Sequence, residues 1–197
     1  AVEEKDPKAI LALEIYGYRL KKYLGAYSFG LGKVDAIVFT AGIGEMSAVV
    51  RAKALDGLEE FGIIYDKEKN KNARTRNCES DISAPDSKVK IFVIPTDEER
   101  VFIEDVVHLM NGTYDLHTRF KYRFQDKDYV NTLRCLEFAE ELKKNPARLN
   151  IMAELFKKAF FQEAKNNPAL KQKIKDIPEL GKQAAFMPQS LRSELGF

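Results

Sequence analysis

The sequence has few of the residues from which disulfide-linked and metal-bound scaffolds are built. Of its 197 residues only two are cysteine and two are histidine. Cys78 and Cys135 are too few and too far apart for a disulfide framework or a thiolate metal site, so we expect two neutral, buried thiols. Since His108 and His117 are the only histidines, a histidine-rich metal site is excluded. Neither has a serine or cysteine in a recognisable nucleophile context, which argues against a catalytic triad.

Long apolar runs are missing as well. No stretch approaches the roughly 18 consecutive apolar residues that span a bilayer, and 31% of the residues are charged. The first residues have neither the basic region nor the apolar region of a signal peptide. We therefore expect a soluble, cytoplasmic protein without a membrane partner. Its 45% apolar content is enough to bury a core.

Glycine and negative charge become scarce toward the end of the chain. Residues 1–117 hold 16 basic against 20 acidic residues, a balance of −4, whereas residues 118–197 hold 16 against 10, a balance of +6. The second part contains only two glycines, Gly181 and Gly196. These shifts predict two units, residues 1–112 and residues 113–197.

The first unit has an α/β pattern. Asp6-Pro7 is typical of a helix start, and apolar residues then recur at helical spacing until Gly32. The apolar run at residues 34–40 predicts a buried strand, a glycine-containing turn follows at 41–45, and a helix is expected over 47–61. Strand, glycine turn and helix in this order are typical of α/β proteins.

Further elements complete this unit. Residues 63–65 predict a short strand, and the polar segment 66–80 is expected to be a surface excursion. Residues 89–94 predict a second buried strand. Thr96 followed by Glu99 has the spacing of a capping box, and we expect it to start the next helix.

The second unit is expected to be all helical. Helices are predicted over 128–144, 146–164, 168–177 and 178–186, separated by Asn-Pro and Ile-Pro breaks. Its basic residues and aromatic rings allow a nucleic-acid face. Aromatics at helical spacing more often pack a core, and the charge excess is modest, so we expect no nucleic-acid partner. The second unit is therefore interpreted either as a helical cap packed on the first unit or as a module that docks a partner.

Gly42 and Gly44 lie between the first predicted strand and a helix. Glycine there lets a ligand approach backbone N–H groups at a helix start, which suits a phosphate. The spacing lacks the third glycine of a dinucleotide fingerprint, where Ser47 stands, and the Gly-Lys-Ser/Thr of a Walker loop. A tight structural turn therefore remains an alternative to a phosphate or nucleotide contact.

A resemblance favours the nucleotide. The segments 34–45, 47–51, 86–90 and 93–96 are similar, in the right order, to those of acetate kinases, which belong to the actin, Hsp70 and sugar-kinase superfamily. The resemblance covers roughly residues 1–110. It implies an α/β fold with an actin-like ATPase (ribonuclease H-like) lobe on a mixed sheet, followed by the all-helical extension. It also implies ATP or ADP as substrate, Mg²⁺, and the conversion of acetate to acetyl phosphate.

The resemblance also implies which residues bind the nucleotide. Gly42, Ile43, Gly44, Glu45 and Met46 match the family's Gly-Ile-Gly-Glu-Asn loop, with the isoleucine placed to touch the adenosine. The last position is methionine instead of asparagine. A thioether is only a weak acceptor and no donor, so one polar contact is expected to be missing.

The magnesium carboxylate carries over to a second position. Glu98 matches the first glutamate of the family's Asn-Glu-Glu, and a hard cation that bridges phosphates needs an oxygen ligand of this kind. An acid that merely stabilises the helix start is the alternative. Glu99 is explained as the capping-box partner. Asp97 replaces the family's asparagine, and its charge either strengthens metal binding or repels the nucleotide.

Other parts of the family's active site have no counterpart in the sequence. The acetate pocket, the catalytic arginines and the phosphate-binding histidines belong to an N-terminal lobe, so no catalytic residue is assigned. We expect an incomplete enzyme whose partners are acetate, ATP, the N-terminal lobe and, by resemblance, a second copy in a homodimer. The alternative is a non-catalytic nucleotide-binding or scaffold protein that uses its helical tail to bind a partner.

Overall fold

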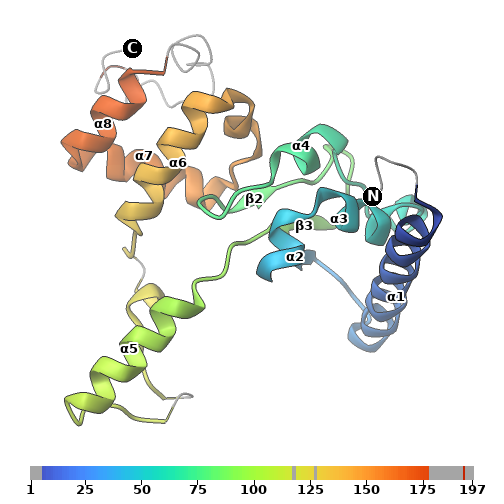
Figure 1. Ribbon diagram of the computed structural model, residues 1–197, viewed down its shortest axis with the longest axis horizontal. Coiled ribbons are helices and arrows are strands. Elements are labelled where there is room, and N and C mark those ends of the chain that lie inside the picture. Colours follow the sequence, from blue (N-terminus) through green and yellow to red (C-terminus); the bar gives the residue numbers. More distant parts are fainter. Residues whose placement is uncertain (1–5, 117–118, 127, 178–192, 194–197) are drawn as a thin grey trace.

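A three-stranded mixed sheet lies at the centre of the protein (Figure 1). The structure, a computed structural model, describes residues 6–116, 119–126, 128–177 and 193. Strand β1 (Ala36–Phe39) pairs in parallel with β3 (Lys90–Val93), and β2 (Ser80–Asp81) pairs with β3 in the antiparallel direction. Both predicted strands and the mixed α/β class are thus confirmed, but β1 is not the buried strand expected, because only Ile37 is buried and Val38 is 49% exposed. The strand expected at residues 63–65 is reduced to a single bridge between Tyr65 and Ser83.

The first helix begins and ends as predicted. In α1 (Pro7–Leu31) the Asp6 side chain caps the start by accepting from the Lys8 N–H at 3.0 Å, and Gly32 with φ 73° follows the end. The helix packs along α3, and Gly17 faces Lys53 of α3 at short range. A Cβ atom there would lie 2.5 Å from Cβ of Lys53, so only glycine allows this helix spacing.

The glycine turn and the following helix differ from the prediction. Residues expected as a turn form a short helix, α2 (Ala41–Met46), because the glycines tolerate helical as well as turn geometry. The helix expected over 47–61 ends early, as α3 (Ala48–Leu55). Gly57 has φ 77°, and this left-handed conformation separates α3 from the 3-10 helix η1 (Glu59–Phe61).

The polar segment 66–80 was expected to be a surface excursion, and this prediction is wrong for part of it, since charged residues such as Lys67 and Arg74 are exposed but other residues are buried. It forms α4 (Lys67–Asn72), and Asn70, Thr75 and Cys78 within the segment are buried. Polar groups can be buried when their hydrogen bonds are satisfied. The Asn70 amide, for example, accepts from Arg51 Nε at 2.7 Å and donates to the Ala48 carbonyl at 2.9 Å.

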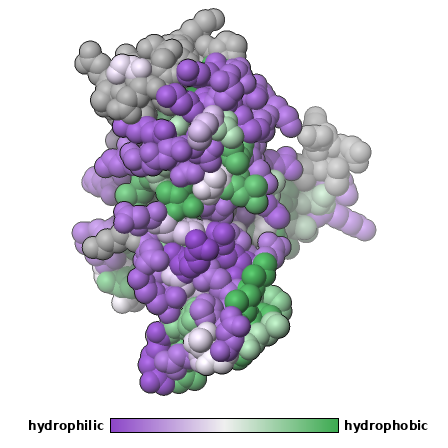
Figure 2. Space-filling view, turned by 90° about the vertical axis from the view of Figure 1, so that its left-hand side faces the viewer, coloured by the Kyte–Doolittle hydropathy of each residue, from purple (hydrophilic) through white to green (hydrophobic). Residues whose placement is uncertain are grey.

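The helix after β3 is present, but its start differs from the prediction. In α5 (Glu98–Met110) the N-cap is Asp97, which makes no side-chain cap, and the expected capping box of Thr96 and Glu99 does not form. Thr96 instead donates to another part of the chain. Helix α5 projects from the body (Figure 1) and has no buried residue. Apolar surface is exposed at the end of the molecule that α5 occupies (Figure 2).

The C-terminal part is helical, as expected. Its elements are η2 (Arg123–Gln125), α6 (Thr132–Lys144), η3 (Pro146–Ile151), α7 (Glu154–Asn166) and α8 (Pro168–Lys175). The single helix expected over 146–164 is divided into η3 and α7, because Met152 and Ala153 are extended and Ala153 donates its N–H to the Glu79 carbonyl at 2.8 Å. The helix expected over 178–186 lies outside the described residues.

Two cores hold the elements together. The first packs the sheet against α3 and includes Ile151 of η3, and the second packs α6, α7 and α8 around Phe138 and Phe160 and includes Cys78. Each core therefore contains a side chain from the other half of the chain. The rings of Phe138 and Phe160 meet edge to face with 5.6 Å between centroids. The aromatics of α7 thus pack inside, as the core interpretation of the tail predicts.

Both thiols are buried and free, as expected. Burial raises the pKa of Cys78 well above its ordinary value and raises the pKa of Cys135 to about 12. Both thiols therefore stay protonated at neutral pH. Separately, none of the helices that the structure describes combines the length and apolar content needed to cross a bilayer.

We predict that Ile151→Ala destabilises the whole protein. Its side chain is 1% exposed and belongs to the core around the sheet. Removing it should lower the free energy of unfolding by about 2–5 kcal/mol in a single urea transition. Leu155→Ala, at a side chain that is 82% exposed, is the control and should change stability by less than about 0.5 kcal/mol. Equal effects of the two variants would show that η3 does not pack on the sheet as described.

Candidate functional site

The candidate site lies where two parallel strands end. The register places Phe39 of β1 beside Val93 of β3, so α2 and residues 94–99 both leave the sheet at its carboxyl edge. The Ile94 N–H donates to the Phe39 carbonyl at 2.9 Å, which keeps the two exits together. Ligands of open α/β sheets bind at this edge.

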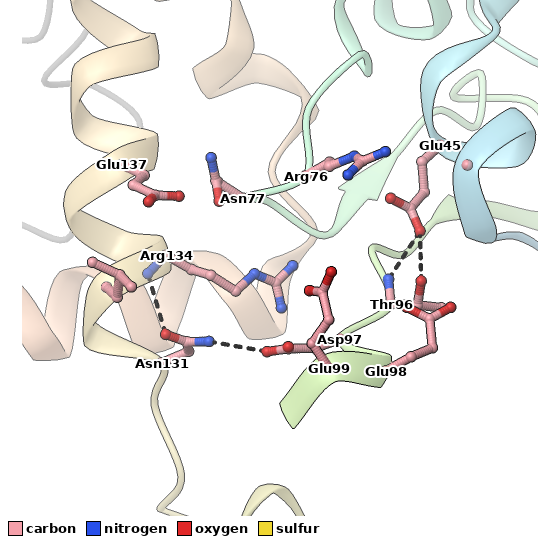
Figure 3. Close-up of a pocket in the computed structure, with 12 residues that line it drawn as sticks. Glu45, Arg76, Asn77, Thr96, Asp97, Glu98, Glu99, Asn131, Arg134 and Glu137 are labelled. Atoms are coloured by element: carbon pink, nitrogen blue, oxygen red, sulfur yellow. Dashed lines mark hydrogen bonds between the residues drawn. The ribbon is translucent and has the colours of Figure 1, made fainter. Parts of the chain in front are cut away.

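A cavity of about 330 Å³ opens there (Figure 3). Its lining is mostly polar and comes from α2, from the segment before β2, from the start of α5 and from α6. The lining residues are Gly42, Glu45, Arg76, Asn77, Thr96, Asp97, Glu98, Glu99, Asn131, Leu133, Arg134 and Glu137. The structure thus brings together two of the residues predicted to bind nucleotide and the residue predicted to bind magnesium.

The other predicted nucleotide residues lie on α2 but do not line this cavity. Ile43 is 53% exposed, Gly44 and Met46 are half-buried, and none of the three is among the lining residues. A Cβ atom at Gly44 would lie 3.4 Å from the backbone of Phe39, so the glycine lets α2 sit close against the end of β1. A nucleotide contact by these three residues stays a prediction.

Glu45 joins the two halves of the site. Its side chain is only 3% exposed, and Oε1 accepts from the Thr96 N–H at 2.9 Å and from the Thr96 hydroxyl at 3.0 Å. A carboxylate that receives two such bonds is held firmly. The visible role of Glu45 is therefore to fix α2 against the segment that carries Glu98.

Arg51 stabilises the position of α2 through hydrogen bonds to its last turn. Its guanidinium is fully buried and donates to the carbonyls of Gly44 and Glu45, at 2.7 and 2.8 Å, and to both the side chain and the carbonyl of Asn70, each at 2.7 Å. A fifth bond reaches the Ala73 carbonyl at 3.3 Å. Burial lowers the pKa of Arg51 to about 10, so the group remains charged at neutral pH.

Glu98 is exposed at the rim of the cavity. A hydrogen bond from its own backbone N–H, together with the charge of Arg76, holds the pKa of its carboxyl below the ordinary value. Among the described residues no three His, Cys, Asp or Glu side chains gather into a group that could hold a metal ion alone. An ionised carboxylate of this kind suits Mg²⁺, which takes one or two protein carboxylates and completes its shell with phosphate and water.

Six lining residues escaped the sequence analysis, and five of them are polar; the sixth is Leu133 of α6. Arg76 and Asn77 lie in the segment expected to be a surface excursion, and Asn131, Arg134 and Glu137 lie at the start of α6. None of them belongs to a motif. No local pattern could have identified them, because the start of α6 meets the site only through long-range contacts such as the Asn131–Asp97 hydrogen bond and the Arg134–Glu79 ion pair.

The fold and site define an α/β protein with a polar cavity at the carboxyl edge of its parallel strands. Comparison with known proteins gives the family. A profile of the acetokinase family matches residues 1–104, which is more than half of the chain. The chain belongs to the acetokinase family.

Relatives with curated names support this assignment. The chain is 54% identical over 153 residues to an acetate kinase of Treponema pallidum, a match that covers 77% of this chain and 34% of the relative. It is 57% identical over 127 residues to an acetate kinase of Trichlorobacter lovleyi, covering 64% and 30%. The chain thus spans about a third of the length of these relatives. Since the first match exceeds the 104 residues of the profile, it extends into the helical C-terminal part.

A solved structure shows a similar fold. The acetate kinase of Porphyromonas gingivalis superposes with a TM-score of 0.50 at 40% sequence identity. The superposition covers 56% of this chain and 27% of that chain. The structure therefore matches part of an acetate kinase, in agreement with the resemblance of the first hundred residues.

We predict that Thr96→Val loosens the link between α2 and α5. The substitution keeps the shape but removes the hydroxyl that donates to Glu45, which should cost about 1.5 kcal/mol of unfolding free energy, the lower figure for a bond to a charged acceptor. Thr40→Val, at an exposed hydroxyl that makes no cap hydrogen bond, is the control. Chemical denaturation of both variants measures the difference. No difference between them would mean that the Thr96 hydroxyl is not bound to Glu45.

Proposed function

We propose that this chain is the nucleotide-binding part of an acetate kinase. In this proposal residues 1–112 form an actin-like (ribonuclease H-like) lobe, and the enzyme transfers a phosphoryl group from ATP to acetate, giving acetyl phosphate and ADP. Membership of the acetokinase family supports it. The observation that carries it is the meeting of α2 and residues 97–99 at one polar cavity on the carboxyl edge of the sheet.

The nucleotide would lie across α2. Gly42 lines the cavity and exposes backbone without a side chain, so phosphate oxygens can come close to the helix start. Ile43 is exposed next to it and offers an apolar contact for the adenosine. Glu45 and Gly44 position this helix through Thr96 and Arg51. Met46 is part of the same helix and supplies no strong polar contact.

Magnesium would be held by Glu98. Like any exposed glutamate, Glu98 is ionised at neutral pH, and its lowered pKa keeps it charged at lower pH as well. It stands at the rim of the cavity where phosphates would enter. When bound, Mg²⁺ neutralises phosphate charge and orients the transferred group. The Asp97 side chain accepts no N–H of α5, and its Oδ2 accepts from the Asn131 amide at 3.4 Å, which fixes this neighbouring carboxylate beside Glu98.

The rest of the active site would come from other parts of the kinase. Phosphoryl transfer needs cations around the transferred group and an acetate held in line with it. Apolar side chains on α1 and α5 support a larger assembly, because Phe29, Leu31, Phe102 and Met110 are between 69% and 87% exposed. Surfaces of this kind are usually covered by another part of the protein or by a second subunit. A cytoplasmic homodimer is part of the proposal.

The rival function is a non-catalytic nucleotide-binding or scaffold protein. The packing of α6, α7 and α8 around Cys78, and of α6 on η3, gives the tail a structural role in this chain, and no separate observation favours a partner-binding role. Nucleotide binding and restored activity separate the two functions.

We predict that ADP with Mg²⁺ binds at α2. In an NMR titration the amides of Gly42, Ile43 and Gly44 should shift, because they lie beside the cavity that Glu98 borders. The amides of α8 (Pro168–Lys175), on the opposite side of the helical part, serve as the internal control. Shifts confined to α8, or no shifts at millimolar nucleotide, would refute the nucleotide site.

We also predict that the chain alone is inactive and that an acetate kinase N-terminal lobe added in trans restores acetyl phosphate formation. The lobe would supply the acetate pocket and the transition-state cations that this proposal places outside the chain. Trapping acetyl phosphate as the hydroxamate measures the product. Glu98→Ala should abolish the restored activity, whereas Glu68→Ala, at an exposed position of α4, should leave it unchanged. Turnover by the chain alone would contradict the division of the site between two lobes.

A further inference from the structure

One wall of the cavity is built by the helical C-terminal part. Asn131, Arg134 and Glu137 are in or next to the first two turns of α6, and all three line the same cavity as Gly42 and Glu98. The Asn131 side chain caps α6 by accepting from the Arg134 N–H at 3.2 Å and also donates to Asp97. The start of α6 is thereby tied to the start of α5.

Arg134 has more donors than partners. Its side chain is 19% exposed, and Nη1 lies 3.3 Å from a carboxylate oxygen of Glu79. Nε and Nη2 are buried but have no hydrogen-bond partner among the described residues. A buried, charged donor without an acceptor is costly, so such a group commonly awaits a ligand or an ion. Figure 3 shows the side chain reaching from α6 across the cavity toward residues 97–99.

The other groups around the cavity define what it can accept. Arg76 contributes a second guanidinium from the segment before β2, and the uncapped start of the 13-residue α5 adds its N–H groups. Five carboxylates oppose these donors: Glu45, Asp97, Glu98, Glu99 and Glu137. A free anion would meet net negative charge here. A phosphate chain that carries a divalent cation satisfies both signs at once, with the cation on the carboxylates and the phosphate oxygens on the guanidinium.

We propose that Arg134 binds the phosphate chain of the magnesium–nucleotide complex, so that the helical C-terminal part completes the nucleotide site. Nε and Nη2 present the forked pair of donors that recognises phosphate oxygens, while Nη1 remains on Glu79. The inference rests on the proposed nucleotide site. It adds a phosphate-binding residue that lies outside the residues matched by the acetokinase profile, which end at 104.

Calorimetric titration of the full chain with MgADP tests the affinity. Arg134→Gln should weaken binding about tenfold or more, because a forked, charge-assisted contact is lost. Arg134→Lys, which keeps the charge but not the fork, should fall between Arg134→Gln and the unaltered chain. Lys144→Gln removes the same charge from the exposed far end of α6 and should stay within about twofold. Loss of affinity in Lys144→Gln equal to that in Arg134→Gln would overturn the inference, because the effect would then be one of net charge.

A direct observation of the side chain separates binding from a structural role. In nitrogen-15 NMR spectra the arginine Nε–H signal that disappears in Arg134→Lys should shift when MgADP is added to the unaltered chain. If the chain binds MgADP and this signal does not move, the inference fails while the proposed function stands. If the unaltered chain binds no MgADP, both fail. Equal unfolding midpoints of Arg134→Lys and Lys144→Gln confirm that the variants remain folded.

Discussion

The guanidinium of Arg51 organises the side of the protein that carries the candidate site. It is fully buried and gives its hydrogen bonds to carbonyl and amide oxygens of α2, α4 and the residue after α4. Those oxygens lie at helix ends, where intrahelical donors run out. The side chain therefore replaces several missing backbone partners at once. A short helix such as α2 has little stability of its own, and the hydrogen bonds from Arg51 keep it in a fixed position at the end of β1.

The walls of the cavity are held together by contacts between segments that are distant in sequence. Glu45 of α2 binds Thr96 before α5, and Asp97 accepts from Asn131 before α6. The chain thus places three helix starts around one cavity. Each start contributes N–H groups or charged side chains, and their mixture of carboxylates and guanidinium groups suits a ligand of mixed charge better than a simple anion.

The sequence predicted the local features well and the long-range ones poorly. The two strands follow from short apolar runs, and α1 follows from Asp6-Pro7 and its helical spacing, because these signals depend only on neighbouring residues. The burial of β1 was overestimated, since only Ile37 in it is buried. The assumption that a polar segment lies outside failed at Asn70, which is buried because Arg51 satisfies it. The capping box at Thr96 failed for a similar reason, since Glu45, 51 residues away, takes the hydroxyl. Gly42, Glu45 and Glu98 were found through family resemblance, whereas Arg134 belongs to no motif.

Ile151 packs in the core around the sheet and Cys78 packs in the core of the helical part, and this arrangement constrains how the sequence can evolve. A change of side-chain volume at either position alters the packing in the half of the chain that did not change. The sheet and the helical part must therefore accumulate substitutions in step, and a shuffled copy that joined this sheet to a different helical tail would begin with a void or a clash in both cores. Recombination breakpoints should be scarce between residues 78 and 151, and tolerated combinations there should be inherited together.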